Sequence, residues 1–313
     1  MTTYRFSGHE TFPCRYPWLP KAVQAVSNDT TILTSAREDD AMVELGVGKN
    51  MVRSMRFWAE AAGVISSRKD GHELTYFGNK LLFGDDGFDP YLEDIQTLWL
   101  IHWRLATNQT ALIFAWDFLL NQFHEPELYT SSVVRAFSKS ATQVAEKEMS
   151  RGSLQQLYDV FLHSYVPTRG RKGEVREDNL DCPLVELELL RHTGFTNSAL
   201  NPGRLEAKYA FRNEDKPEIG PALFAFCLEE FWNNRFGSTE QSIPFHLIAS
   251  GHGSPGQVFK IPETDVRTRL FTVEKQTEGF FTFEESAAIP RVVRHEKKEA
   301  PSLASIYEAP AYA

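Results

Sequence analysis

Residues 45–65, LGVGKNMVRSMRFWAEAAGVI, limit the possible folds more than any other part of the chain. Gly46 stands at a corner where the backbone needs a residue that tolerates positive φ. After the corner, apolar residues recur at the three- and four-residue spacing of a helix with one buried face. The pattern predicts a short helix, a tight turn and a second helix, which is a helix-turn-helix.

The second helix of this segment is expected to turn polar residues outward near its N-terminal end. A helix-turn-helix usually makes its base and phosphate contacts from that end. The residues expected to face a DNA groove are Lys49, Asn50, Arg53 and Ser54. The sequence therefore predicts a DNA-reading surface directly after the glycine corner.

A hairpin is predicted for residues 64–78, VISSRKDGHELTYFG, because an Asp-Gly pair separates two short extended runs. A helix-turn-helix followed by a hairpin is a winged helix, and its tip would bring Arg68, Lys69 and His72 to a DNA backbone. Between residues 47 and 80, six Lys and Arg residues stand against three acidic ones. This local excess of positive charge favours DNA contact. The alternative is a winged helix that docks another protein.

The composition is that of a globular protein with an acidic body. The formal net charge of −9 argues against a protein coated in nucleic acid, although it allows one small basic surface. No apolar run approaches the roughly 20 residues of a membrane helix, and no signal peptide is recognisable. Cys14, Cys182 and Cys227 are too few and too widely spaced for a disulfide framework, so we expect a cytoplasmic protein.

The rest of the chain predicts a mainly α, α+β fold. Helical spacing of apolar residues runs from about residue 93 to 165, where tryptophans indicate a helical core. Further helices are expected at Leu184–His192, at residues 217–236 and near residues 264–276, with short strands around the last of these. The expected domains are residues 1–90 with the winged helix, a helical domain at 91–238, a small α+β unit at 239–295, and a flexible tail at 296–313.

Residues 168–190, TRGRKGEVREDNLDCPLVELELL, form a polar loop with a basic half followed by an acidic half. The basic residues expected to contact phosphates are Arg169, Arg171 and Lys172. The carboxylates expected to act in catalysis are Glu177, Asp178 and Asp181. Hard carboxylates beside phosphates suit a phosphodiesterase that uses Mg²⁺ or Mn²⁺, with Asp178 and Asp181 as metal ligands. A solvated loop with locally paired charges is the alternative.

His9 and Glu10 lie in the aromatic stretch FSGHETF and are the second candidate for catalysis. A histidine beside a carboxylate can act in acid–base chemistry or bind a metal. The alternative is a buried histidine that is hydrogen-bonded to the backbone.

The string GHGSPG at residues 251–256 matches the GxGxxG pattern of dinucleotide-binding turns. That function needs a strand before the glycines and a helix directly after them. Pro255 interrupts the turn and the following QVFKIP has an extended pattern, so we interpret this string as a connecting loop.

Four segments together resemble the SspB-type proteins of bacterial phosphorothioate DNA-modification and defence systems, which are catalogued as a domain of unknown function. The segments are FSGHETFPCRYPWLPK at 6–21, LGVGKNMVRSMRFW at 45–58, EDNLDCPL at 177–184 and SPGQVFKIPE at 254–263. Their shared order is more specific than any one of them, and they span nearly the whole chain.

This resemblance implies a protein that nicks one DNA strand so that partner proteins can replace a non-bridging phosphate oxygen with sulfur. The implied partners are an ATPase, an ATP-pyrophosphatase-like sulfur transferase and a cysteine desulfurase; a homodimer is also considered. The sequence carries no PD-(D/E)xK pattern and no paired HxH. Two alternatives therefore stay open: a non-catalytic winged-helix adaptor that positions the sulfur-transfer enzyme and the ATPase on DNA, and a winged-helix transcription regulator.

Overall fold

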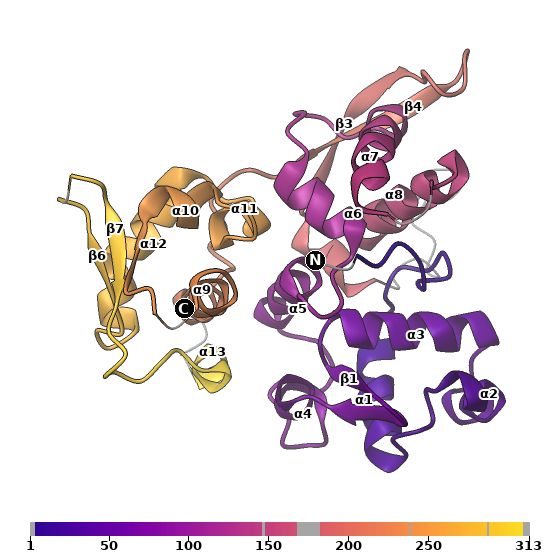
Figure 1. The fold of residues 1–313 in the computed structure, drawn as a ribbon, viewed down its shortest axis with the longest axis horizontal. Helices are drawn as coiled ribbons and strands as arrows, with labels where there is room; N and C mark the ends of the chain where they lie inside the picture. Colours follow the sequence, from indigo (N-terminus) through magenta and orange to yellow (C-terminus); the bar gives the residue numbers. More distant parts are fainter. Residues whose placement is uncertain (1–3, 146–147, 168–181, 238, 287, 309–313) are drawn as a thin grey trace. The chain divides into compact units, whose positions relative to one another are not determined.

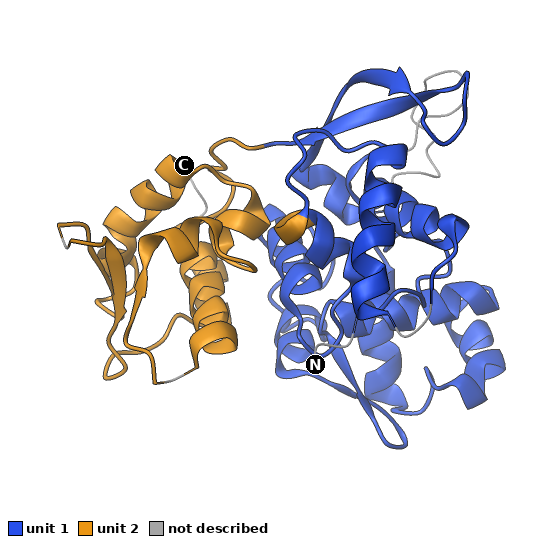
Figure 2. Cartoon of the chain, turned by 45° about the horizontal axis from the view of Figure 1, so that its top comes forward, with its two compact units in different colours: residues 1–119, 123–212 blue, residues 120–122, 213–313 orange. Residues whose placement is uncertain are grey.

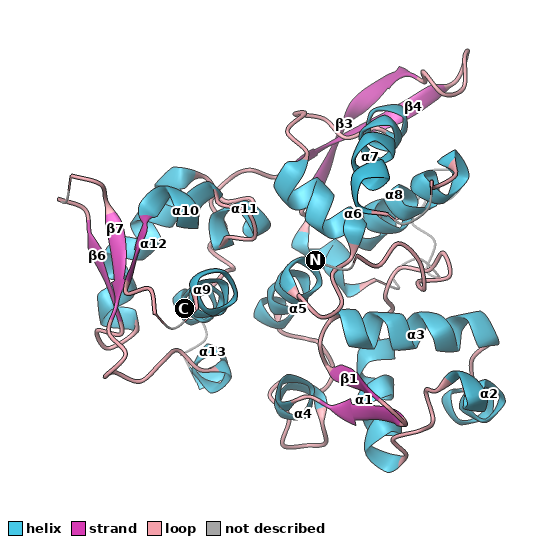
Figure 3. Ribbon diagram, viewed as in Figure 1, coloured by secondary structure: helices cyan, strands magenta, loops and turns pink. Residues whose placement is uncertain are grey.

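The computed structural model is mainly α-helical, with three small antiparallel sheets in the part of the chain it describes (Figure 3). The described residues are 4–145, 148–167, 182–237, 239–286 and 288–308. The predicted fold class, mainly α within α+β, is confirmed. The chain forms two compact units, drawn in different colours in Figure 2. Unit 1 consists of Met1–Leu119 and Phe123–Arg212, and unit 2 of Leu120–Gln122 and Asn213–Ala313.

The first part of unit 1 follows the helix, corner, helix and hairpin order that the sequence predicts (Figure 1). Its elements are α1 (Trp18–Asn28), η1 (Ser35–Arg37), α2 (Glu38–Leu45), α3 (Lys49–Ala61), β1 (Ile65–Arg68), β2 (Gly71–Leu74) and α4 (Tyr76–Leu82). Gly46 ends α2 with φ +67°, in the left-handed region expected for the corner. The hairpin pairs Ile65 with Leu74 and Arg68 with Gly71.

The helices of the middle region form an aromatic core, as the spacing of apolar residues predicts. The elements are α5 (Ile95–Thr107), α6 (Phe114–Asp117), the π-helical turn η2 (Phe118–Gln122), α7 (Thr130–Val144) and α8 (Arg151–Tyr165). Trp99, Trp103 and Trp116 are fully buried, and the Trp116 ring packs edge-on against Trp58 of α3 at 5.4 Å between centroids. The core therefore continues from these helices into the helix-corner-helix region.

The helix expected at Leu184–His192 is wrong. A 3-10 turn, η4 (Pro183–Leu187), is followed by two long antiparallel strands, β3 (Leu190–Asn197) and β4 (Leu205–Phe211). The run LVELELL lies mostly in η4, and only its last residue, Leu190, belongs to β3. In Figure 3 this hairpin lies beside α7 and α8 of the same unit.

Unit 2 combines helices with a three-stranded sheet of order β5-β7-β6. Its elements are α9 (Pro221–Phe236), β5 (Ser242–Pro244), α10 (Phe245–Ser250), α11 (Pro255–Phe259), α12 (Glu263–Gln276), β6 (Phe281–Glu284), β7 (Arg291–Arg294) and α13 (Leu303–Glu308). The predicted helix near residues 264–276 is present as α12. The expectation of an extended QVFKIP is wrong, because Ser254 caps a short helix there by accepting a hydrogen bond from the Gln257 backbone N–H.

Three residues from the middle of the chain belong to unit 2 (Figure 2). The Leu120 carbonyl accepts hydrogen bonds from the side chains of Gln257 at 2.6 Å and Lys260 at 2.5 Å. The Asn121 side-chain oxygen accepts one from the Gly253 backbone N–H at 2.8 Å. The boundary between the units therefore does not coincide with the expected domain boundaries after residues 90 and 238.

Among the described helices, none is long and apolar enough to cross a membrane.

Candidate nucleic-acid interface

The glycine corner sets the position of the first turn of α3. The backbone N–H groups of Gly46 and Val47 both donate to the Met42 carbonyl, which closes the end of α2. Gly48 then takes an extended conformation, and α3 begins at Lys49. Because the first turn of a helix carries unpaired N–H groups and partial positive charge, this end of α3 suits an anionic ligand.

A nearly buried carboxylate organises the cations at this end of α3. Glu38, whose side chain is 6% exposed, accepts hydrogen bonds from Arg53 Nε at 2.7 Å and Nη2 at 3.0 Å. The Lys49 Nζ lies 3.0 Å from the same carboxylate. These contacts, those of Arg53 first, lower the pKa of Glu38 to about 2. Glu10 lies close enough to help raise the pKa of Arg53, after the larger effect of Glu38.

The predicted outward face of α3 is only partly outward. Lys49 and Asn50 are exposed and Arg53 is half-buried, as a groove-facing end requires. The placement of Ser54 on this face is wrong, because its side chain is buried and its hydroxyl donates to the His9 carbonyl at 2.9 Å.

The N-terminal segment covers the rest of this side of α3. The Trp58 indole N–H donates to the Phe12 carbonyl at 3.0 Å. Gly8 lies against the Phe57 ring so closely that an added Cβ would be 2.8 Å from Cδ2. In Figure 1 the chain leading into α1 runs along α3 on the side away from α1. On this side of α3, Lys49, Asn50 and Arg53 keep exposed surface for a large ligand.

The hairpin presents fewer cations than the sequence predicts. Arg68 is exposed and pairs with Glu73 across the strands, and Lys69 is exposed at the turn. The placement of His72 at the tip is wrong. Its side chain is 5% exposed, and its Nε2 lies 3.1 Å from the Glu60 carboxylate.

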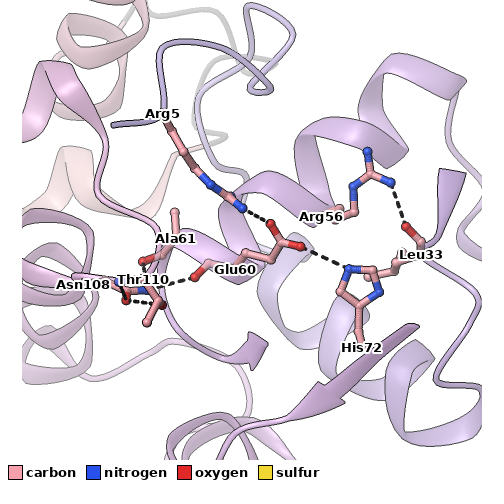
Figure 4. Close-up of polar contacts among 8 residues, drawn as sticks. All are labelled: Arg5, Leu33, Arg56, Glu60, Ala61, His72, Asn108 and Thr110. Atoms are coloured by element: carbon pink, nitrogen blue, oxygen red, sulfur yellow. Dashed lines mark hydrogen bonds and ion pairs between the residues drawn. The ribbon is translucent and has the colours of Figure 1, made fainter. Parts of the chain in front are cut away.

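Glu60 links the hairpin to the N-terminal segment, as Figure 4 shows. Its carboxylate binds both His72 and Arg5. Burial alone would raise the pKa of Glu60, but the hydrogen bond from His72 and the Arg5 charge lower it below its usual value. Nearby, Arg56 donates to the Leu33 carbonyl at 2.9 Å, so this arginine anchors a loop. Sequence reasoning missed these roles, since partners 12 to 55 residues apart leave no local pattern.

His9 and Glu10 occupy a loop with an unusual backbone. Glu10 and Thr11 both have positive φ, +47° and +72°, which is uncommon for residues other than glycine. The His9 side chain is buried, its Nδ1 accepts from the Thr11 N–H at 3.3 Å, and burial lowers its pKa to about 4. His9 is therefore neutral at pH 7. It is a buried histidine hydrogen-bonded to the backbone, which is the alternative given for it above.

Most of the predicted catalytic loop, residues 168–181, lies outside the described residues. Six of the expected site residues lie outside the described residues: Arg169, Arg171, Lys172, Glu177, Asp178 and Asp181. Among the side chains that the structure does describe, no group of three or more His, Cys, Asp or Glu residues is arranged to hold a metal ion.

Comparison with known proteins supports the resemblance found in the sequence. A family model described as a protein of unknown function, DUF4007, matches residues 6–308. A magnesium ion-bound SspB crystal structure is similar with a TM-score of 0.79 and 25% identity, covering 98% of this chain and 86% of the other. A second SspB crystal structure has a TM-score of 0.78 and 25% identity, covering 94% and 84%. No curated protein matches the chain.

Proposed function

Because the chain belongs to the DUF4007 family and has the fold of SspB, we propose that it is a DNA-binding protein of a phosphorothioate DNA-modification system. The observation that carries the DNA-binding part is the open N-terminal end of α3. There two cations, Lys49 and Arg53, meet around the Glu38 carboxylate at the helix end that carries partial positive charge. The proposed groove residues are Lys49, Asn50 and Arg53, with Arg68 and Lys69 on the DNA backbone.

Arg53 is the residue best prepared to read a base. Glu38 binds the Nε and Nη2 atoms, which holds the guanidinium plane in one orientation. Among the described contacts, the two Nη1 hydrogens and the second Nη2 hydrogen are left to face a ligand. An arginine whose plane is fixed loses less rotamer entropy when it donates to the O6 and N7 atoms of guanine. We therefore assign Arg53 to a base and Lys49, as a flexible point charge, to a phosphate.

The test is the affinity of the full chain for a duplex at moderate salt, measured by gel shift or fluorescence anisotropy. Replacing Arg53 with alanine is expected to weaken binding about 5- to 150-fold if the contact is to a base. The matched control is Arg291→Ala, which removes an arginine of comparable exposure that is paired with Glu284 in unit 2. Equal affinities for the wild type and both variants would remove α3 from the interface.

Nicking of one strand is the second candidate, and its support is that one similar structure is described as a magnesium ion-bound SspB. The assay is supercoiled plasmid with and without Mg²⁺ or Mn²⁺, scored for open circles. Metal-dependent open circles support a nickase. Binding without open circles supports the adaptor, which would position the ATPase, the sulfur transferase and the cysteine desulfurase on DNA. If the wild type binds no duplex either with or without metal, both the nickase and the adaptor are contradicted.

A further inference from the structure

The β3–β4 hairpin and α8 enclose a hollow of about 430 Å³ in unit 1. This volume lies within the range of about 300–1,000 Å³ typical of small-ligand sites. Side chains from three elements meet there: His163 from α8, His192 and Phe195 from β3, and Ala207 and Tyr209 from β4. The hollow is separate from the α3 residues to which DNA binding is assigned above.

A bulge in β3 directs two rings into this hollow. His192 pairs with Tyr209 and Gly194 with Lys208, so Thr193 is an extra residue without a partner in the register. In a regular strand, residues three apart point to opposite faces. The extra residue instead places His192 and Phe195 on one face, together with Tyr209.

The bulge is built into the sequence. Gly194 has φ +135°, a conformation that other residues rarely adopt, although an added Cβ would meet nothing within 4 Å. The glycine is therefore needed for the backbone and not for space. The Thr193 hydroxyl donates to the Glu127 carboxylate at 2.9 Å, and this hydrogen bond holds the extra residue in place. Bulges of this kind often re-aim a side chain at a functional site.

The rings leave an apolar surface open. His192 meets Phe195 edge-on at 4.9 Å and 66°, and meets Tyr209 edge-on at 5.5 Å and 72°. Rings arranged edge-on do not stack face to face on one another. The Phe195 side chain is 63% exposed, which is a large exposure for an aromatic residue within a strand. A planar ligand can therefore still stack on its ring.

The described lining of the hollow carries no acidic side chain that would repel an anionic ligand. The lining contains two histidines, in a chain whose net charge is −9. Aromatic side chains on which successive bases stack are the usual platforms for single-stranded nucleic acid, and the exposed Phe195 ring is such a platform.

We propose that this hollow binds an unstacked base of single-stranded DNA, with Phe195 as the stacking platform. The inference rests on the proposed DNA-binding function and adds a second surface to it. A protein that holds a duplex at α3 and an unpaired base at the hairpin would recognise DNA whose strands have locally separated.

The probe is an oligothymidylate of about 12 nucleotides, a length that fits single-strand sites. It carries one central 2-aminopurine, whose fluorescence is quenched by stacking. The wild type is expected to quench it, and Phe195→Ala to lose the quenching with an affinity about 5- to 150-fold lower. Phe195→Trp should restore both. Phe271→Ala, which removes a phenylalanine of 59% exposure in unit 2, is the matched control and should behave as the wild type.

Two further variants separate the hollow from α3. Gly194→Ala should reduce quenching, because it strains the bulge that aims His192 and Phe195. Arg53→Ala should weaken duplex binding and leave quenching intact. Equal quenching by the wild type and Phe195→Ala, or none by the wild type, overturns the inference. Quenching that depends on Phe195 while Arg53→Ala binds duplex normally would uphold the hollow and contradict the role given to α3.

Discussion

Protonation of His9 is expected to destabilise unit 1 below neutral pH. The imidazole is buried among α3 and its own loop, and burial lowers its pKa from 6.5 to about 4. As the pH falls through 6.5, His9 of the unfolded chain becomes protonated, whereas His9 of the folded chain becomes protonated only near pH 4. Stability is therefore complete above pH 6.5 and is lost progressively below it.

The size of this effect follows from the two pKa values. At about pH 5, the unfolded histidine is almost fully protonated and the folded one is about one-tenth protonated, which lowers the free energy of unfolding by about 2 kcal/mol. His9→Gln removes the titration and can keep an acceptor for the Thr11 N–H. Between about pH 7.5 and pH 5, the free energy of unfolding of the wild type should therefore fall by about 2 kcal/mol more than that of His9→Gln.

Urea unfolding followed by tryptophan fluorescence measures this difference. Five of the six tryptophans belong to unit 1, where His9 lies, so the signal reports that unit. His124→Gln, at an exposed histidine of the same unit, is the control and should keep the wild-type pH dependence. If His9→Gln loses as much stability as the wild type on acidification, the histidine is not held neutral by burial.

Three further predictions concern the loop, the cation cluster and the unplaced carboxylates. Gly8→Ala should lower the free energy of unfolding by about 2 kcal/mol in urea, because φ is +113° and the new Cβ meets Phe57; Gly46→Ala, with open space around it, should cost about half as much. Glu38→Gln should steepen the salt dependence of duplex binding by up to about one unit of log K per log [salt], and an unchanged slope would contradict its electrostatic role. Asp178→Ala should abolish metal-dependent plasmid nicking without weakening binding; full nicking would place catalysis elsewhere.

Local signals explain why the helix-corner-helix order and the first hairpin could be predicted. Gly46 and the Asp70-Gly71 pair mark turns through backbone preferences that any chain would show. Which side of α3 stays open depends instead on residues far away in the sequence. The His9 and Phe12 carbonyls accept hydrogen bonds from Ser54 and Trp58 and cover them. The sequence close to α3 contains no signal that predicts these contacts. The predicted outer face was therefore right at its start and wrong one turn later.

The β3–β4 hairpin was missed for a different physical reason. Residues 184–187 form a 3-10 turn and only Leu190 of the run 184–190 lies in β3, so that run carries no signal of the strand. The bulge at Thr193 then breaks the alternation that would have identified β3. A Gly between Thr and Phe was the available signal, since an isolated glycine in an extended run suggests a bulge.

Because Leu120–Gln122 belong to unit 2, they determine which fragments of this protein can fold independently. A fragment that starts at Asn213 would lack the Leu120 carbonyl, to which the Gln257 and Lys260 side chains donate. The C-terminal third is therefore not a portable module: transplanting it, or releasing it by proteolysis after Arg212, would leave behind a short peptide on which its own packing depends.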